Sequence, residues 1–110
     1  MQKLSLDAQA RELLKSAAGD ANGRSAETVY GGHERVLRQT LLALTEGRSH
    51  AEHASPGEAT VLVLHGRVRL VCGDVSWEGR RGDLIAVPPE RHSVEALEDS
   101  AFLLTVAKPG

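Results

Sequence analysis

Hydrophobic residues recur with two different periods along this chain of 110 residues. In residues 5–18 apolar side chains return every three or four positions, which predicts an amphipathic α-helix. Ser5 or Asp7 can cap its first turn, and Gly19 predicts its end. A helix this short needs a packing partner, so we expect it either to plug one end of a barrel or to bind a partner protein.

Beyond the helix, the polar and glycine-rich residues 19–35 predict a connector, with Thr28–Tyr30 as a short edge strand inside it. From Val36 onward, short runs of β-branched and aliphatic residues alternate with turn residues, which predicts strands. We expect strands at 36–44, 60–64, 68–72, 75–78, 84–87, 93–97 and 101–107. This rhythm is typical of a sandwich or barrel, so we divide the single domain into residues 1–35, the helix and edge segment, and residues 36–110, the barrel.

Composition excludes several classes of function. A net charge of −2 provides no basic field for nucleic acid, and the only aromatic residues are Tyr30, Trp77 and Phe102, so surfaces for stacking bases are scarce. No apolar run approaches the ~20 residues of a membrane span. Cys72 is the only cysteine, so it forms no internal disulfide. We therefore expect a soluble cytoplasmic protein with no nucleic-acid or membrane partner.

Candidate chemistry begins in residues 47–66, GRSHAEHASPGEATVLVLHG. Their spacing resembles the first motif of the cupin superfamily, in which two glycines bracket two histidines and a glutamate. Gly47 and Gly66 occupy the end positions, and His53 occupies that of the first histidine. Ser55 and Ala59 stand where the second histidine and the glutamate belong.

Residues 82–96 are similar to the second cupin motif. The pattern is kept at Gly82, Pro88 and His92, whereas Glu90 replaces a glycine, Ala96 replaces an asparagine and the gap before His92 is one residue short. The chain thus resembles a small single-domain cupin over about residues 36–107. This resemblance implies an all-β, cupin-like jelly-roll barrel with one short N-terminal helix. A small open barrel of the oligonucleotide-binding kind is the alternative, but it fits the number of strands less well.

In cupins three histidines and a glutamate from the two motifs hold a divalent metal such as iron, manganese, nickel or zinc. This chain retains His53 and His92 at those positions, and two imidazoles make a poor metal site. His50 and Glu58 are nearby substitutes, although simple alternation places each on the strand face opposite the motif positions.

We expect His53 and His92 to face one pocket from neighbouring strands, with Ser55 and Ala59 on the same wall. A divalent metal there would rest on His53 and His92, with help from His50 or Glu58. Cys72 and Trp77 are expected to fill the core, although Trp77 could instead line the cavity. Glu90 and Glu95 are expected to be solvated rather than to act as acid or base.

Two functions from different classes remain open. The preferred one is a cupin that binds a small polar or anionic ligand in its barrel and carries a degenerate metal site. The alternative is a metal-dependent enzyme of the dioxygenase or isomerase type, so a catalytic role stays undecided. A regulatory partner held through the N-terminal helix has no support beyond the helix itself. The resemblance also implies a homodimer, in which residues 24–35 either extend a partner's sheet or cover the edge of their own barrel.

Overall fold

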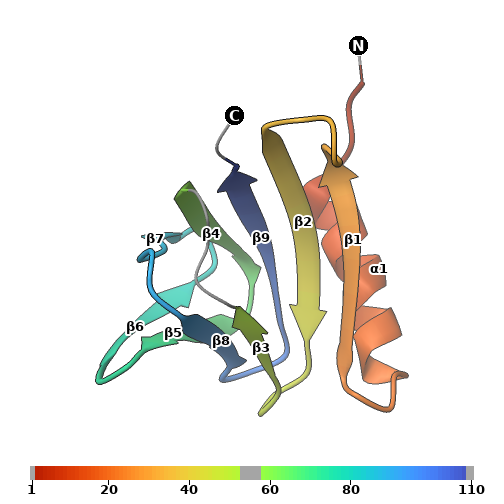
Figure 1. Ribbon diagram of the computed structural model, residues 1–110. Coiled ribbons are helices and arrows are strands. Elements are labelled where there is room, and N and C mark those ends of the chain that lie inside the picture. Colours follow the sequence, from red (N-terminus) through yellow and green to blue (C-terminus); the bar gives the residue numbers. More distant parts are fainter. Residues whose placement is uncertain (1, 53–57, 109–110) are drawn as a thin grey trace.

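One helix precedes nine strands in the computed structural model, which describes residues 2–52 and 58–108 (Figure 1). The elements are α1 (Leu6–Ala18), β1 (Arg24–Tyr30), β2 (Leu37–Leu44), β3 (Ser49–Glu52), β4 (Glu58–His65), β5 (Arg67–Cys72), β6 (Val75–Arg80), β7 (Leu84–Ala86), β8 (His92–Ala96) and β9 (Ser100–Ala107). The strands after Val36 lie close to their predicted positions. The predicted all-β chain with a single N-terminal helix is therefore confirmed.

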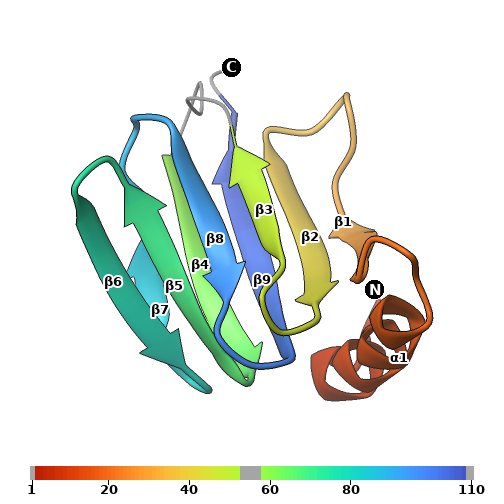
Figure 2. The ribbon, with the colours of Figure 1, turned by 90° about the horizontal axis from the view of Figure 1, so that it is seen from below.

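The strands form two antiparallel sheets that face each other (Figure 2). One has five strands in the order β1-β2-β9-β4-β7, and the other has four in the order β3-β8-β5-β6. From β2 onward, consecutive strands mostly alternate between the two sheets, so the chain crosses repeatedly between the layers. Strands that are distant in sequence, such as β2 and β9, therefore pair within one sheet. This is the double-sheet arrangement of a jelly roll.

The main core lies between the two sheets and consists of side chains that alternate along each strand. In β4, for example, Val61 and Val63 are fully buried, whereas Leu62 and Leu64 point to the other face of the sheet. The inward-facing core residues are Leu42, Leu44, Val61, Val63, Val68, Leu70, Ile85, Val94, Ala96 and Phe102. Their alternation identifies which other residues face the interior.

Helix α1 begins at the N-cap Ser5, whose hydroxyl accepts a hydrogen bond of 3.2 Å from the amide of Ala8, and it ends at Gly19. Its buried face, which includes Leu13 and Ala17, packs on the outer side of the five-stranded sheet. The expectation that the helix plugs one end of the barrel is therefore wrong. Periodicity identifies the apolar stripe of a helix but does not say which surface the stripe covers.

Strand β1 is longer than the predicted Thr28–Tyr30 and pairs with β2 along its length. Residues 24–30 thus cover the edge of their own barrel, which is one of the two arrangements we considered for this segment. Strand β3, in the histidine-rich segment, was not predicted as a separate strand. It pairs with β8 through its backbone. Its sequence SHAE has no apolar alternation, so the pattern of side chains does not predict a strand there.

No helix in the described part of the chain is long and apolar enough to cross a membrane.

Candidate functional site

His92 is the first residue of β8, and it faces the space between the sheets. Its side chain shares the inward face of the strand with Val94 and Ala96, and only 5% of its surface is exposed. The sequence places a polar residue at the end of an otherwise apolar inward stripe. His92 thus lies on the core-facing side of β8, and its role in a ligand pocket stays a prediction.

A backbone hydrogen bond orients the imidazole of His92. Its Nδ1 atom lies 3.0 Å from the carbonyl oxygen of Glu90. Because a carbonyl oxygen only accepts hydrogen bonds, Nδ1 carries the proton and donates it. Neutral His92 therefore keeps its lone pair on Nε2, which makes no hydrogen bond to any residue in the described ranges.

Ala59 lies on the inward face of β4, in phase with the buried Val61 and Val63. At this position, where cupins have a glutamate, the chain has only a methyl group, which offers no metal ligand and no charge. His53 and Ser55, the other predicted pocket residues, lie outside the described ranges 2–52 and 58–108. Whether the four predicted residues share one pocket therefore stays a prediction.

The two substitute ligands differ in their placement. Glu58 is exposed and in phase with the outward-facing Leu62, so its strand directs it away from the interior. His50 pairs with the inward-facing Val94, two positions along β8 from His92. The two histidines are thus diagonal neighbours on the inward face, a relation that puts Cα atoms about 7–8 Å apart. His50 also lines a cavity of about 350 Å³ beside β1 and β2.

A divalent metal does not fit the donors in the described part of the chain. No group of three or more histidine, cysteine, aspartate or glutamate side chains there is arranged to hold a metal ion. Ala59 supplies no ligand, and Glu58 lies on the outward phase. Since selective sites usually use three or more protein ligands, His92 and His50 alone do not make one.

Two side chains near His92 belong to residues that we expected in the core (Cys72) and in solvent (Glu90). Extending the register of β5 and β8 by one pair brings Cys72 opposite His92, and the Sγ atom of Cys72 lies 3.9 Å from Oε2 of Glu90. Trp77 pairs with the buried Leu70 and so shares its inward face, but it is 49% exposed because β6 is an edge strand. The expectation that Trp77 fills the core is wrong, whereas Cys72 is half-buried.

Alternation along β5 already places Cys72 on the inward face with Val68 and Leu70. Alternation along β6 likewise places Trp77 on the inward face, but its exposure depends on which strand lies at the edge of the sheet. Glu95, by contrast, points outward and lies 3.7 Å from Nη1 of Arg69. It therefore takes no part in the site.

Comparison with known proteins agrees with this architecture. The profile of the cupin domain family matches residues 40–107. A conserved protein of unknown function from Streptococcus pyogenes has a similar structure, with a TM-score of 0.72 and 26% identity over 83% of this chain and 79% of that one. Comparison with curated proteins found no match.

Two further solved structures share the fold. A cupin superfamily protein from Desulfitobacterium hafniense has a TM-score of 0.71 at 17% identity and covers 78% of each chain. A cupin 2 conserved barrel domain protein from Salinispora arenicola has a TM-score of 0.64 at 22% identity, over 81% of this chain and 78% of that one. The predicted jelly-roll barrel is thus confirmed, and this chain belongs to the cupin domain family.

Proposed function

We propose that this cupin domain binds a small polar or anionic molecule between its two sheets, with His92 as the principal hydrogen-bonding group. The observation that carries the proposal is the arrangement at His92. One ring nitrogen is held by the carbonyl of Glu90, while the buried ring leaves Nε2 without a partner among the described residues. We infer that a ligand between the sheets forms its hydrogen bond with this nitrogen.

The ring's protonation decides which ligand group it binds. Neutral His92 accepts a hydrogen bond at Nε2 from a hydroxyl or amine of the ligand. Protonated His92 donates from Nε2 and so binds a carboxylate or phosphate oxygen. The methyl group of Ala59 adds no negative charge to the side of the pocket formed by β4. His53 and Ser55 complete the proposed pocket.

Replacing His92 with alanine is expected to weaken binding about tenfold or more, because hydrogen bonds to charged groups are worth about 1.5–3 kcal/mol. Suitable probes are malonate, orthophosphate and ribose, titrated by calorimetry against the normal protein and the variant. Long-range ¹H–¹⁵N spectra of the imidazoles report directly on Nε2 of His92. His65→Ala is the control, since His65 is exposed at the end of β4. If no probe at millimolar concentration shifts the His92 ring, the proposal fails.

A metal-dependent enzyme of the dioxygenase or isomerase type is the second candidate, and one observation favours it. Histidines that bind metals usually donate their other ring N–H to a carbonyl or carboxylate, as His92 does to Glu90. We expect protein purified without chelators to contain far less than one metal ion per chain, since the described residues do not gather a ligand set. Stoichiometric iron, manganese, nickel or zinc in elemental analysis would instead favour the enzyme.

We also propose that two copies associate through the edge of the five-stranded sheet. β1 is the first strand of that sheet, and its only neighbour among the described strands is β2. Unpaired strand edges are ready to pair with a second chain. Exposed apolar side chains, including Tyr30 and Leu37, lie next to this edge. Sedimentation at micromolar concentration should give twice the chain mass of 11.8 kDa, and a single species at 11.8 kDa would reject the dimer.

A further inference from the structure

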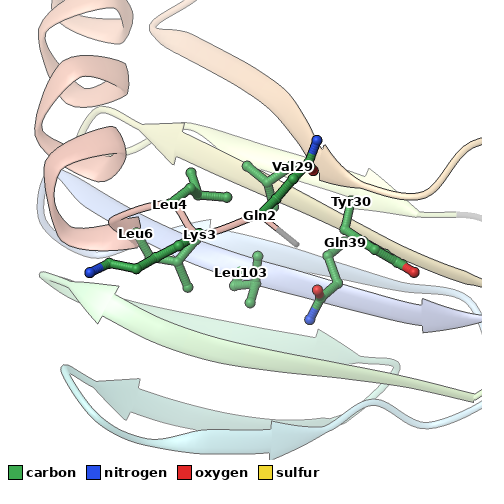
Figure 3. Close-up of a pocket in the computed structure, with 8 residues that line it drawn as sticks. All are labelled: Gln2, Lys3, Leu4, Leu6, Val29, Tyr30, Gln39 and Leu103. Carbon is green, nitrogen blue, oxygen red and sulfur yellow. The ribbon is translucent and has the colours of Figure 1, made fainter.

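A groove lies on the outer face of the five-stranded sheet, next to the N-terminal end of α1 (Figure 3). Its volume is about 570 Å³, within the range of about 300–1,000 Å³ that is common for small-molecule sites. It is lined by Gln2, Lys3, Leu4, Leu6, Val29, Tyr30, Gln39 and Leu103. Because it is on the opposite face of the sheet from the main core, it is separate from the site around His92.

A β-bulge in β1 builds one wall of the groove. Thr28 pairs with Thr40, but the next pair joins Tyr30 to Gln39, so Val29 is an extra residue in the strand. Val29 packs with the outer cluster around Leu103, and Tyr30 shares the face of Gln39. Two consecutive side chains consequently face the same side, which regular strand alternation does not allow. Bulges frequently redirect side chains next to binding sites.

The segment before α1 forms the opposite wall. Residues 2–4 run from the start of the helix across the outer face of the sheet, above Leu103 (Figure 3). Leu6, Val29 and Leu103 contribute an apolar floor, and Leu4 remains 44% exposed. Leu4 therefore extends the apolar surface of the floor to the rim of the groove.

Two polar side chains in the groove are held in place by neighbours. The Nε2 atom of Gln39 donates a hydrogen bond of 3.2 Å to Oγ1 of Thr105. The hydroxyl of Tyr30 accepts one of 3.3 Å from Nη1 of Arg35, whose guanidinium lies 5.4 Å from the centre of the ring. These contacts fix a polar end of the groove at low cost in side-chain entropy.

The charge of the lining has one sign. Lys3 is the single charged residue among the eight lining residues, and none of them is acidic. Asp7 is the acidic residue nearest to Lys3 along the chain. Its Oδ2 atom forms an ion pair of 2.7 Å with Nη1 of Arg11. An anionic group is therefore accommodated in the groove without an opposing carboxylate in its lining.

From the apolar floor, the bulged wall and the single cation we propose that this groove binds an amphipathic monocarboxylate of medium chain length. The alkyl chain lies on Leu6, Val29 and Leu103, and the carboxylate reaches the ammonium group of Lys3. The site has no part in the function proposed for His92, and the ligand differs from the small polar molecules proposed there.

Binding of hexanoate, octanoate and decanoate, kept below their micelle concentrations, tests the proposal by calorimetry and ¹H–¹⁵N amide spectra. We expect affinity to rise up to about fourfold for each added CH₂ that is fully buried. The amides of Val29, Tyr30, Gln39 and Leu103 should shift most. Lys3→Gln should weaken decanoate binding up to about fivefold, as for an exposed ion pair, whereas Lys15→Gln on the far part of the helix should not.

A blocking variant separates the groove from the rest of the protein. Val29→Phe fills the groove and should abolish decanoate binding, whereas Thr28→Phe adds a similar bulk to the neighbouring exposed position and should preserve it. Both variants are first checked for folding by circular dichroism. The malonate and phosphate titrations at His92 should be unchanged in either variant.

Three results overturn the inference. Decanoate that shifts amides around His92 and Trp77 rather than the groove would place the carboxylate in the other site. Decan-1-ol binding as tightly as decanoate would remove the role of Lys3. Shifts of the Gln39 and Leu103 amides with protein concentration alone, away from the β1 edge at which we propose the dimer, would show that a second copy of the chain covers this face.

Discussion

Replacing Phe102 with alanine is expected to lower the free energy of unfolding by about 3–5 kcal/mol, the usual cost of removing a fully buried aromatic side chain. Phe102 is 0% exposed and lies on β9, the central strand of the five-stranded sheet. It is flanked by Leu42 on β2 and Val63 on β4, both in the main core. Rigid strands on both sides limit how far the interior can collapse into the cavity.

Urea denaturation followed by circular dichroism measures this loss. Trp77→Ala serves as the matched control, because it removes a larger aromatic group from an edge strand where 49% of the side chain is already exposed. In that variant the free energy of unfolding should fall by about 1 kcal/mol, the typical cost of a point mutation. An equal loss in the two variants would contradict the assignment of Phe102 to the centre of the core.

Gly66→Ala is expected to lower the free energy of unfolding by about 3–4 kcal/mol, from backbone strain together with lost hydrogen bonds. Gly66 has φ +78°, and a Cβ atom there would lie within 3.0 Å of the carbonyl oxygen of Asp99 and of the Ser100 side chain. The buried hydroxyl of Ser100 accepts a hydrogen bond from the amide of Arg67 and lies within hydrogen-bond distance of two carbonyl oxygens, those of Arg67 and Glu98. An added methyl group would displace this hydroxyl.

Gly47 provides the control within the same motif. It has φ +86°, close to that of Gly66, but a Cβ atom there would meet nothing within 4 Å. Gly47→Ala should therefore lower the free energy of unfolding by only about 1–2 kcal/mol, the cost of placing alanine in the left-handed backbone conformation. Thermal unfolding of the two variants separates backbone strain from steric conflict. Equal melting temperatures would show that contact with the β9 turn adds nothing.

Part of the candidate site follows from the sequence because strand alternation is local. Once β8 is placed, the spacing of His92, Val94 and Ala96 puts the histidine on the same face as the core. The same alternation in β4 places Ala59 inward. The inward position of His50 required the register between β3 and β8, which depends on pairing between segments some forty residues apart.

The position of Trp77 shows a second limit. Alternation places it on the inward face, but its half-exposure arises because β6 is the last strand of its sheet. The order of strands in a sheet is set by which hydrophobic faces pack together across the whole chain. Edge position is consequently a property of the assembled fold rather than of the segment itself.

By itself the sequence determined the elements and their faces: one amphipathic helix, a series of short strands, and a cupin pattern with serine and alanine at two metal-ligand positions. These features follow from side-chain periodicity and turn residues, which act over a few positions. Only the tertiary structure decided that α1 covers the outer sheet face, that β1 bulges at Val29, and that Lys3 and Leu103 line one groove. Each of these depends on packing between distant segments, where the burial of apolar surface selects one arrangement among several that the local pattern permits.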